Sequence, residues 1–473
     1  MNQGTLVVDL DGTLVRSDML FESFWAALAR NWATPLHSVA SLLKGRAVLK
    51  TRLAELGPVD VPALPYNREV LDYIAQWRAR GGRCALVTAA NHGIAEAIAA
   101  HLDLFDEVHG SSAATNLKGE TKARFLEERY GPDGFAYIGD AEADLPVWER
   151  ASLAIVVSHS AALVAKLRGL GRRFEQIAAQ GPAPQTYLKA LRPHQWVKNL
   201  LVFVPLLAAH ALSWEHLAPT LLAFVAFSLI ASAGYVFNDL LDLAADRAHP
   251  RKRNRPFASG ALPISHGTVM APGLLAAGLL FALPLGAQTV GLLVVYFALT
   301  MLYSLRLKRQ AMIDVCALAC LYTLRIVAGG TATAILPSVW LLAFSVFFFL
   351  SLALVKRQSE LVANSAAGSE QIAGRGYRAS DLPLVTAMAL ASGYVSIVIM
   401  TLYMMSPDVL VLYHLPQALW GICLVLLYWI SRMILISHRG EMDDDPIVFA
   451  ARDPASQLSL LVMAACAIVA SVG

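Results

Sequence analysis

The chain has 473 residues, of which 56% are hydrophobic and 15% are charged. Soluble chains average roughly 25% charged residues, so this composition excludes a wholly soluble enzyme. The net charge of +3 is small and does not suggest a nucleic-acid partner. The five cysteines show no paired extracellular pattern.

The first 180 residues have charges throughout, as a soluble domain does, and three of their apolar segments are predicted to be strands that end in polar residues. Those residues are Asp9 and Asp11 in LVVDLDGTL, Thr88 in LVTAAN, and Asp140 and Asp144 in AYIGDAEADLPVW. Lys118 and Lys122 precede the third strand. The segment 18–80 carries apolar residues at helical spacing and predicts a helical cap between the first two motifs.

This order of acidic strand ends, a threonine and a lysine resembles the haloacid-dehalogenase-type phosphatases over nearly all of residues 1–170. The resemblance implies an α/β doubly wound parallel sheet, with the active residues at the carboxyl ends of the strands. It implies that Asp9 attacks phosphorus and that Asp11 protonates the leaving alcohol and later activates water. Thr88 and a lysine, either Lys122 or Lys118, would hold the phosphoryl oxygens. Mg²⁺ would be bound by Asp9 with Asp140 and Asp144, and Asp11 is a further candidate ligand.

A linker over 181–195 is expected between a phosphatase domain, 1–180, and a membrane domain, 196–473. Most apolar blocks of the second part approach the ~20 residues that a membrane-spanning helix needs. They predict an all-α polytopic domain of about nine helices, at 199–212, 217–237, 269–287, 288–305, 311–331, 336–355, 384–404, 415–436 and 456–473.

The N-terminus, MNQGTLVVDLDG, has neither a basic start nor a cleavage site, so we expect the first domain to stay in the cytoplasm. Nine spans then leave four charged segments on the cytoplasmic side, at 238–268, 306–310, 356–383 and 437–455. These segments hold nearly all Lys and Arg of the second half, as the positive-inside rule requires. We therefore expect a multi-pass protein of a bacterial inner membrane.

One cytoplasmic segment, NDLLDLAADRAHPRKRNRPFASG (238–260), combines carboxylates with cations. Asp239, Asp242 and Asp246 are spaced to share one face of a helix, where like charges repel unless a cation intervenes. Oxygen ligands favour Mg²⁺, which normally completes its shell with substrate phosphates. The arginines and the lysine that follow suit an anionic substrate. The alternative is a helix end that frays into a solvated loop.

NDxxDxxxD followed by RPxxSG resembles the UbiA superfamily of intramembrane prenyltransferases, over about residues 186–473. Aromatic prenyltransferases of that superfamily have a second aspartate-rich motif in the loop after helix six. The matching loop here, 356–381, instead opens with Lys356 and Arg357 and has no DxxxD. That difference resembles the polyprenyl-phosphate phosphoribosyltransferases, whose bacterial members make decaprenyl-phosphoryl phosphoribose for cell-wall arabinan. LRPHQWVKNLLVFVPLL (191–207), YSLRLK (303–308) and LRIVAGG (324–330) match that branch too.

The resemblance implies Mg²⁺-dependent transfer of phosphoribosyl from phosphoribosyl diphosphate to a polyprenyl phosphate in the bilayer. The phosphatase would then remove the 5-phosphate of the product. The candidate substrate-binding residues are Asn238, Arg255, Lys198, Tyr303, Lys308, Lys356 and Arg357. Arg325 lies inside an apolar span and is either part of the substrate cavity or half of a buried pair.

Two other functions remain open at this point, and no feature of the sequence sets the oligomeric state. An aromatic prenyltransferase of quinone or haem biosynthesis would need a second acidic clamp. Only Glu360, Glu370 and Asp381 could supply it, at poor spacing. A transporter or membrane scaffold with a regulatory phosphatase would carry out no covalent chemistry at Asp239.

Overall fold

The computed structural model describes residues 4–112, 115–179, 181–366, 375–406, 409, 412–442 and 445–472. The chain divides into two compact units, which are described separately below. One comprises Met1–Leu191 with Tyr235–Ala271, and the other comprises Arg192–Gly234 with Pro272–Gly473. The N-terminal unit therefore includes the segment that carries the three aspartates of the second half.

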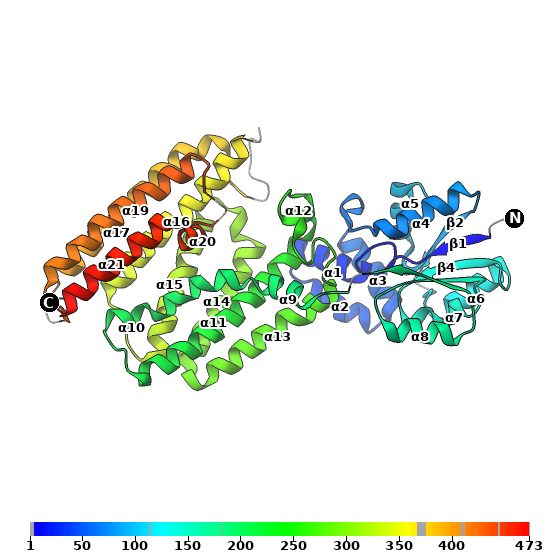
Figure 1. The fold of residues 1–473 in the computed structure, drawn as a ribbon, viewed down its shortest axis with the longest axis horizontal. Coiled ribbons are helices and arrows are strands. Elements are labelled where there is room, and N and C mark those ends of the chain that lie inside the picture. Colours follow the sequence, from blue (N-terminus) through cyan, green and yellow to red (C-terminus); the bar gives the residue numbers. More distant parts are fainter. Residues whose placement is uncertain are drawn as a thin grey trace. The chain divides into compact units, whose positions relative to one another are not determined.

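A parallel sheet forms the centre of the N-terminal unit (Figure 1). Its strands follow the order β3-β2-β1-β4-β5-β6, so the order reverses at β1. Ligands of doubly wound sheets bind beside such a reversal, at the carboxyl ends of the strands. The strands are β1 (Thr5–Val8), β2 (Cys84–Asn91), β3 (Glu107–Ser111), β4 (Phe135–Gly139), β5 (Leu153–Ser158) and β6 (Phe174–Ala178).

Helices cover both faces of this sheet (Figure 1). Buried side chains of α4 (Arg68–Ala79) and α5 (His92–Leu102) pack on one face. The other face is covered by α6 (Glu120–Tyr130), α7 (Leu145–Trp148) and α8 (Ala161–Gly169). Apolar contact on both faces explains why β1, β2 and β4 read as continuous apolar runs. The predicted α/β doubly wound fold is confirmed.

The predicted helical cap is present between β1 and β2, as α1 (Met19–Arg30), α2 (Thr34–Leu42) and α3 (Arg46–Leu56). Asp18 caps the start of α1, because its carboxylate accepts hydrogen bonds from Leu20 N and Phe21 N. One face of α1 is buried, including Trp25 and Glu22. The N-terminal unit also contains η1 (Val61–Ala63), η2 (Glu142–Asp144) and α9 (Pro184–Leu191).

The segment Tyr235–Ala271 packs against helix α1 of the cap. It includes the end of α11 (Trp214–Leu241), α12 (Leu243–Ala248), η4 (Lys252–Asn254) and the start of α13 (Ile264–Ala282). Arg247 of α12 forms a two-pronged ion pair with Glu22, at 2.6 and 3.1 Å, and both side chains are at most 7% exposed. Trp25 donates to Thr268 Oγ1 at 2.9 Å and packs edge-on against Phe237.

The second unit is helical, and helices α11 and α13 contribute to both units. Over the described residues, eight helices are long and apolar enough to cross a membrane. The block 199–212, which we expected to be a ninth span, instead forms η3 (Pro193–Phe203) and the short α10 (Val204–Ala208), with Pro205 inside the first turn. Proline lacks the amide hydrogen that a longer helix through this point would use. The all-α polytopic architecture is confirmed, with this difference in its first block.

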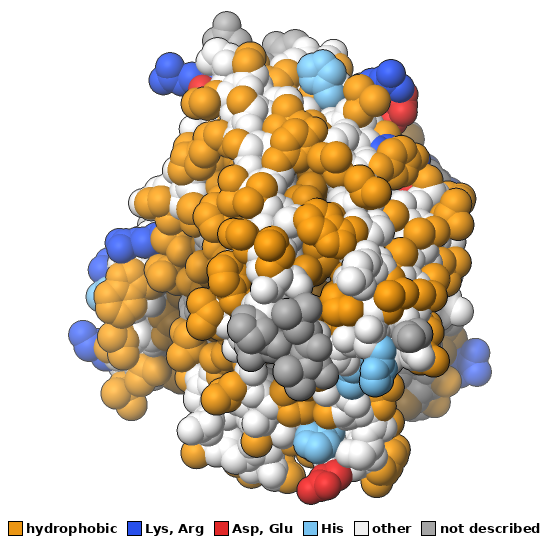
Figure 2. Space-filling view, turned by 90° about the vertical axis from the view of Figure 1, so that its left-hand side faces the viewer, with side chains coloured by type: hydrophobic (Ala, Val, Ile, Leu, Met, Phe, Trp, Pro, Cys, Tyr) orange, Lys and Arg blue, Asp and Glu red, His pale blue; other side chains and the backbone are white. Residues whose placement is uncertain are grey.

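The remaining helices of this unit place some of their apolar residues in a buried core and others on the surface. They are η5 (Leu283–Leu285), α14 (Ala287–Leu305), η6 (Leu307–Arg309), α15 (Ile313–Thr333), α16 (Val339–Ala366), η7 (Ala379–Asp381), α17 (Leu382–Met404), η8 (Pro416–Leu419), α19 (Trp420–His438), α20 (Pro446–Arg452) and α21 (Pro454–Val472). Buried residues of α15, α16, α17 and α19 form one core cluster. Leucines and valines of α19 and α21 are exposed, and apolar side chains cover most of the face in Figure 2. Such a surface suits contact with lipid tails.

A glycine in α15 allows the backbone of η3 to pack closely against this helix. A Cβ built on Gly329 would lie 1.9 Å from the carbonyl oxygen of Val202 in η3. We expect Gly329→Ala to destabilise the fold by about 1–3 kcal/mol, because η3 has to move away. The measurement is thermal unfolding of the purified protein in detergent.

Gly291 of α14 is the matched control, because an added Cβ would meet no atom within 4 Å. Gly291→Ala should be neutral or slightly stabilising. Equal midpoints for the two variants would contradict the close packing of η3 on α15.

Candidate functional site

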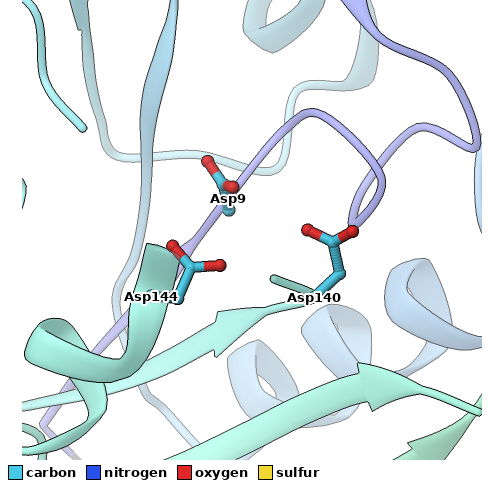
Figure 3. Close-up of side chains that lie close together, drawn as sticks. All are labelled: Asp9, Asp140 and Asp144. Atoms are coloured by element: carbon cyan, nitrogen blue, oxygen red, sulfur yellow. The ribbon is translucent and has the colours of Figure 1, made fainter. Parts of the chain in front are cut away.

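Acidic side chains converge where the order of the sheet reverses (Figure 3). Asp9 follows β1, Asp140 follows β4, and Asp144 ends η2. Carboxylate oxygens of all three lie within 4.8 Å of one another. The turn after β1 requires Gly12, because its φ is +75° and a Cβ there would lie 2.2 Å from Asp140 Oδ2. The DGT sequence thus brings the first strand end against the fourth.

Lys122 of α6 is buried among these carboxylates, at 2% exposure. Its ammonium donates to Asp9 Oδ1 at 2.8 Å and to the Tyr137 hydroxyl at 2.9 Å, and it lies 3.8 Å from Asp144 Oδ1. Tyr137 in turn donates to Asp144 Oδ1 at 2.8 Å. Of the two candidate lysines, the structure brings Lys122 to Asp9, whereas Lys118 is exposed and lines the pocket in front of the carboxylates.

The carboxylates carry more negative charge than one lysine can balance. Burial raises the pKa of Asp140 to about 8, and the charges of Asp9 and Asp144 add to the shift. Burial also raises the pKa of Asp9, although Lys122 opposes that shift. The Lys122 pKa is raised, because Asp9 and Asp144 together outweigh the effect of its burial. Three converging oxygen ligands with excess negative charge fit Mg²⁺, which prefers carboxylate oxygens.

Asp11 and Thr88 stand next to this cluster. Burial raises the pKa of Asp11 well above its ordinary value, and the neighbouring Asp18 raises it further. One Asp11 oxygen accepts a hydrogen bond from Met19 N at 2.8 Å, which holds the side chain in place. Thr88 is fully buried near the end of β2, and its hydroxyl accepts from Ala90 N at 3.0 Å. A raised carboxyl pKa favours the protonated form, which is the form that can donate a proton.

A pocket of about 920 Å³ opens in front of Asp9. The ends of the sheet strands and the cap helices α1 and α3 line this pocket. The segment Tyr235–Ala271 also contributes to the lining, through Gly260, Ala261, Pro263, Ile264 and Ser265. Gly260, at φ +72°, lies close to the backbone of Arg16, since an added Cβ would be 2.8 Å from its carbonyl oxygen. The end of the RPxxSG motif therefore forms one wall of the pocket that contains Asp9.

The aspartate-rich segment has an internal ion-pair cluster. Arg255 Nη1 contacts Asp239 Oδ1 at 3.1 Å and Asp246 Oδ2 at 2.7 Å, so these two aspartates share one side, as their spacing predicts. Asp242 lies between the helices α11 and α12, and Asn238 occupies the last turn of α11; both are half-buried. Burial raises the pKa of Asp246 to about 6, although Arg255 lowers it. Here the arginine supplies the positive charge that this cluster requires.

The candidate cations of the second unit form a separate cluster. Lys198 of η3 pairs with Asp445, and Lys356 of α16 lies 3.6 Å from the same carboxylate. Burial acts to raise the pKa of Asp445, but the two lysines hold it well below its ordinary value. Asp445 also caps α20, by accepting from Ile447 N and Val448 N. Over the described residues, two cations thus share one carboxylate, so this cluster suits an anionic ligand.

The other candidates near the 356–381 loop have protein partners. Arg357 is fully buried and pairs with Asp314, at 3.0 Å, and with Glu360. Its charge is therefore already compensated. Arg375 donates to the hydroxyl of Tyr303 at 2.9 Å and to the carbonyl of Lys308 at 3.4 Å. The structure thus brings Tyr303 and Lys308 together through an arginine of that loop.

Arg325 is buried in α15 with neutral partners. It donates to Asn199 Oδ1 at 3.0 Å, to the Tyr296 hydroxyl at 2.9 Å and to the Leu321 carbonyl at 2.5 Å. Its guanidinium also lies 5.0–5.3 Å from the ring centroids of Phe227, Tyr296 and Tyr322. No carboxylate of the described residues pairs with it, and Asp314 pairs with Arg357 instead. Aromatic faces stabilise a desolvated cation without neutralising it.

Sequence reasoning missed Asp445, Arg375 and the Arg247–Glu22 pair. A signal for Asp445 existed, because DDDP before an apolar stretch is typical of a helix start with proline in its first turn. Arg375 lies in the 356–381 loop, where Lys356 and Arg357 were the predicted cations. No local pattern joins Arg247 to Glu22, which are separated by 225 positions. Of the rival acidic clamp, Glu360 pairs with Arg357 and Asp381 accepts from Arg378 N, while Glu370 lies outside the described residues.

Comparisons with known proteins agree with this architecture. The model of the UbiA prenyltransferase family matches residues 199–470, and that of the haloacid dehalogenase-like hydrolases matches residues 6–149. The protein y4nM of Sinorhizobium fredii, which is uncharacterized, is 43% identical over 454 residues, which are 95% of this chain and 88% of that protein.

Two further relatives match a smaller part of the chain. The nodulation protein NoeC of Azorhizobium caulinodans is 38% identical over 282 residues, which are 59% of this chain and 91% of that protein. Decaprenyl-phosphate phosphoribosyltransferase of Mycobacterium tuberculosis is 39% identical over 194 residues, which are 40% of this chain and 64% of that enzyme. The family match covers more than half of the chain, and the acidic pocket lies in its hydrolase-like part. The chain therefore belongs to the UbiA prenyltransferase family, as an integral membrane transferase that carries an N-terminal haloacid dehalogenase-like hydrolase domain.

Proposed function

We propose that the membrane part transfers phosphoribosyl from phosphoribosyl diphosphate to a polyprenyl phosphate, and that the hydrolase part removes the 5-phosphate of the product. The first half of this proposal is supported by the similarity to decaprenyl-phosphate phosphoribosyltransferases. The two lysines at Asp445, and the protein partners of Glu360 and Asp381, favour it over an aromatic prenyltransferase with two acidic clamps.

The transfer exchanges one bond at ribose C1. The bond from C1 to the diphosphate oxygen breaks, and a phosphate oxygen of the polyprenyl phosphate forms the new bond, so diphosphate leaves. That oxygen is already ionised at neutral pH and needs no general base. Asp239, Asp242 and Asp246 would hold Mg²⁺, which would neutralise the diphosphate when bound. Arg255 would then turn from these carboxylates towards the leaving group, whose growing charge it stabilises.

Two anionic substrates must approach each other, so the acceptor phosphate also needs cations. Lys198 and Lys356 are best suited, since among the residues that the structure describes they pair with the same carboxylate, that of Asp445. Arg357 is less suited than we expected, because Asp314 and Glu360 already pair with it. Arg325 has two candidate roles: to bind a further phosphate oxygen, or to position Tyr322, whose ring also lies against the ammonium of Lys198. We favour the second role, because the Arg325 guanidinium is buried against that ring.

The coupling of the two activities rests on one observation. Gly260, Ala261, Pro263, Ile264 and Ser265, which end the RPxxSG motif and follow it, line the pocket that contains Asp9. The transferase product still carries a phosphomonoester at ribose C5, which is the group that a phosphatase removes. In this reaction Asp9 attacks phosphorus, Asp11 gives its proton to the ribose oxygen, and water later releases phosphate from Asp9. Lys122 would hold the phosphoryl oxygens. We place the hydrolase domain in the cytoplasm, facing the inner membrane of a bacterium.

The first test follows label from phosphoribosyl diphosphate into lipid, with full-length protein in detergent, Mg²⁺ and a polyprenyl phosphate. We expect Asp239→Asn to lower labelling about 10²–10³-fold, because it removes a proposed carboxylate ligand of the Mg²⁺ that would neutralise the leaving diphosphate. Asp9→Asn should label lipid at the normal rate but accumulate a 5-phosphorylated product. Each variant controls for the other. Normal labelling with Asp239→Asn, or identical lipids from Asp9→Asn and the wild type, would contradict the respective half of the proposal.

The second test concerns Mg²⁺ and pH. The pKa of Asp140 is raised to about 8 in the metal-free fold, from an ordinary value of 3.8. Between these two pH values the folded chain therefore keeps a proton on Asp140 that the unfolded chain has lost. Metal-free stability should therefore fall as the pH rises between these values. Mg²⁺ competes with that proton, so we expect a larger Mg²⁺-induced rise in unfolding temperature at pH 8.5 than at pH 6. Asp140→Asn should abolish the difference. A rise that is independent of pH in the wild type would refute this site assignment.

The third test concerns the ion pair between Arg247 and Glu22, which joins the segment that forms the pocket wall to helix α1 of the cap. Arg247→Met leaves Glu22 buried without its partner, which costs about 3–5 kcal/mol, whereas the double variant with Glu22→Leu should recover most of the stability. We expect Arg247→Met to accumulate 5-phosphorylated lipid in the labelling assay while it still hydrolyses p-nitrophenyl phosphate. If the ratio of phosphorylated to dephosphorylated lipid stays at the wild-type value, the pocket wall has no part in handling the lipid-linked product.

A further inference from the structure

The pocket in front of Asp9 is larger than one phosphoryl group requires. Its volume of about 920 Å³ is near the upper end of ordinary ligand sites, which span roughly 300–1,000 Å³. Asp9, Asp140, Asp144 and Lys122 account for the group that reacts. The rest of the pocket must accommodate the leaving group, and its lining tells which chemistry that group has.

Lys50 projects into this pocket from the cap helix α3. Its ammonium donates to the carbonyl oxygen of Ala89 at 2.6 Å and to Asn116 Oδ1 at 3.2 Å. Ala89 directly follows Thr88, so the cation lies beside the residue that we expect to hold the phosphoryl group. Both acceptors are neutral. Among the described residues, no carboxylate forms an ion pair with Lys50.

Lys50 thus differs from Lys122, whose ammonium forms ion pairs with the carboxylates of Asp9 and Asp144. Burial lowers the pKa of Lys50, and the more distant Asp11 and Asp18 offset this only in part. A half-buried ammonium with neutral partners gains most from an anion that arrives with the substrate. Lys122 serves the reacting phosphoryl group, so Lys50 is available for a second one.

Two other cations line the same pocket. Arg46 begins α3, one turn before Lys50, and Lys118 precedes α6. Both side chains are exposed, and neither has a carboxylate partner among the described residues. Arg16, which also lines the pocket, differs from them because it pairs with Glu69 at 2.9 Å. One part of the pocket therefore offers uncompensated positive charge.

We propose that Lys50, with Arg46 and Lys118 at the rim, forms a second anion site that holds a phosphate on the leaving group. The substrate class is a sugar phosphomonoester with a second phosphate group elsewhere on the sugar. Water cleaves only the monoester, releases inorganic phosphate, and leaves the second phosphate attached. This deepens the proposed function and rests on it for the natural substrate, since the transferase product has a phosphodiester at C1 and a monoester at C5.

The test uses full-length protein in detergent with Mg²⁺ and two soluble probes. Both are ribose 5-phosphates; C1 carries a methyl phosphodiester in one and a methoxy group in the other. Phosphate release gives kcat/KM for each. We expect the wild type to prefer the phosphodiester about tenfold or more, mainly through KM, because a charge-assisted hydrogen bond contributes that much. Lys50→Met should bring the ratio of the two values close to one.

Lys44→Met is the matched control, because Lys44 is an exposed lysine of the same cap that does not line the pocket. It should keep the wild-type ratio. Equal kcat/KM values for the two probes in the wild type would overturn the anion site. A Lys50→Met variant that loses the same factor on both probes would also overturn it, since Lys50 would then act on the reacting phosphate or on the fold.

These outcomes are separate from those of the labelling assay. A protein that transfers no phosphoribosyl to lipid but prefers the phosphodiester probe keeps the anion site and loses the proposed transferase function. A protein that labels lipid but shows no preference keeps the transferase and loses the anion site.

Discussion

The buried ammonium of Lys122 is the contact on which the hydrolase domain depends. Without it, Asp9, Asp140 and Asp144 would crowd negative charge at one edge of the sheet, where their side chains are buried or half-buried. The lysine touches Asp9 and Tyr137, and Tyr137 in turn touches Asp144, so helix α6 is tied to strand β4 and to the turn after β1. Burying a charge is costly unless it is paired, which makes this set of contacts mutually dependent.

The same constraint recurs in the membrane part, with different solutions. Arg255 stands between Asp239 and Asp246, and Asp445 stands between Lys198 and Lys356. Arg325 relies on aromatic rings and neutral acceptors instead. Among the described residues, the charges in these places are not matched one to one. Arg357, between Asp314 and Glu360, is the opposite case, where the charge is matched by the protein itself.

The sequence predicted the parts of this protein whose residues are set by local pattern. Asp9, Asp140 and Lys122 lie at strand ends or on a helix next to the sheet, so parallel strands bring them to one edge. The spacing of Asp239 and Asp246 likewise placed them on one side. What escaped prediction depends on contacts between distant segments, such as Asp445 with Lys198 and Arg247 with Glu22. The first apolar block was also misjudged, because its length suggested a span while Pro205 limits the helix that it forms.

The domains of a fusion protein are often treated as independent folding units, each of which can be exchanged for a homologue. Here the compact unit that contains the hydrolase also contains Tyr235–Ala271, a stretch within the part of the chain that the UbiA family model matches. A chimera that takes its first 191 residues from another source would lose Glu22 and leave Arg247 without this partner. Its pocket would combine foreign strand ends with the wall that this chain supplies from Gly260 to Ser265. A substitution in the segment Tyr235–Ala271 can therefore affect the hydrolase pocket, although it lies in the part of the chain that the UbiA family model matches.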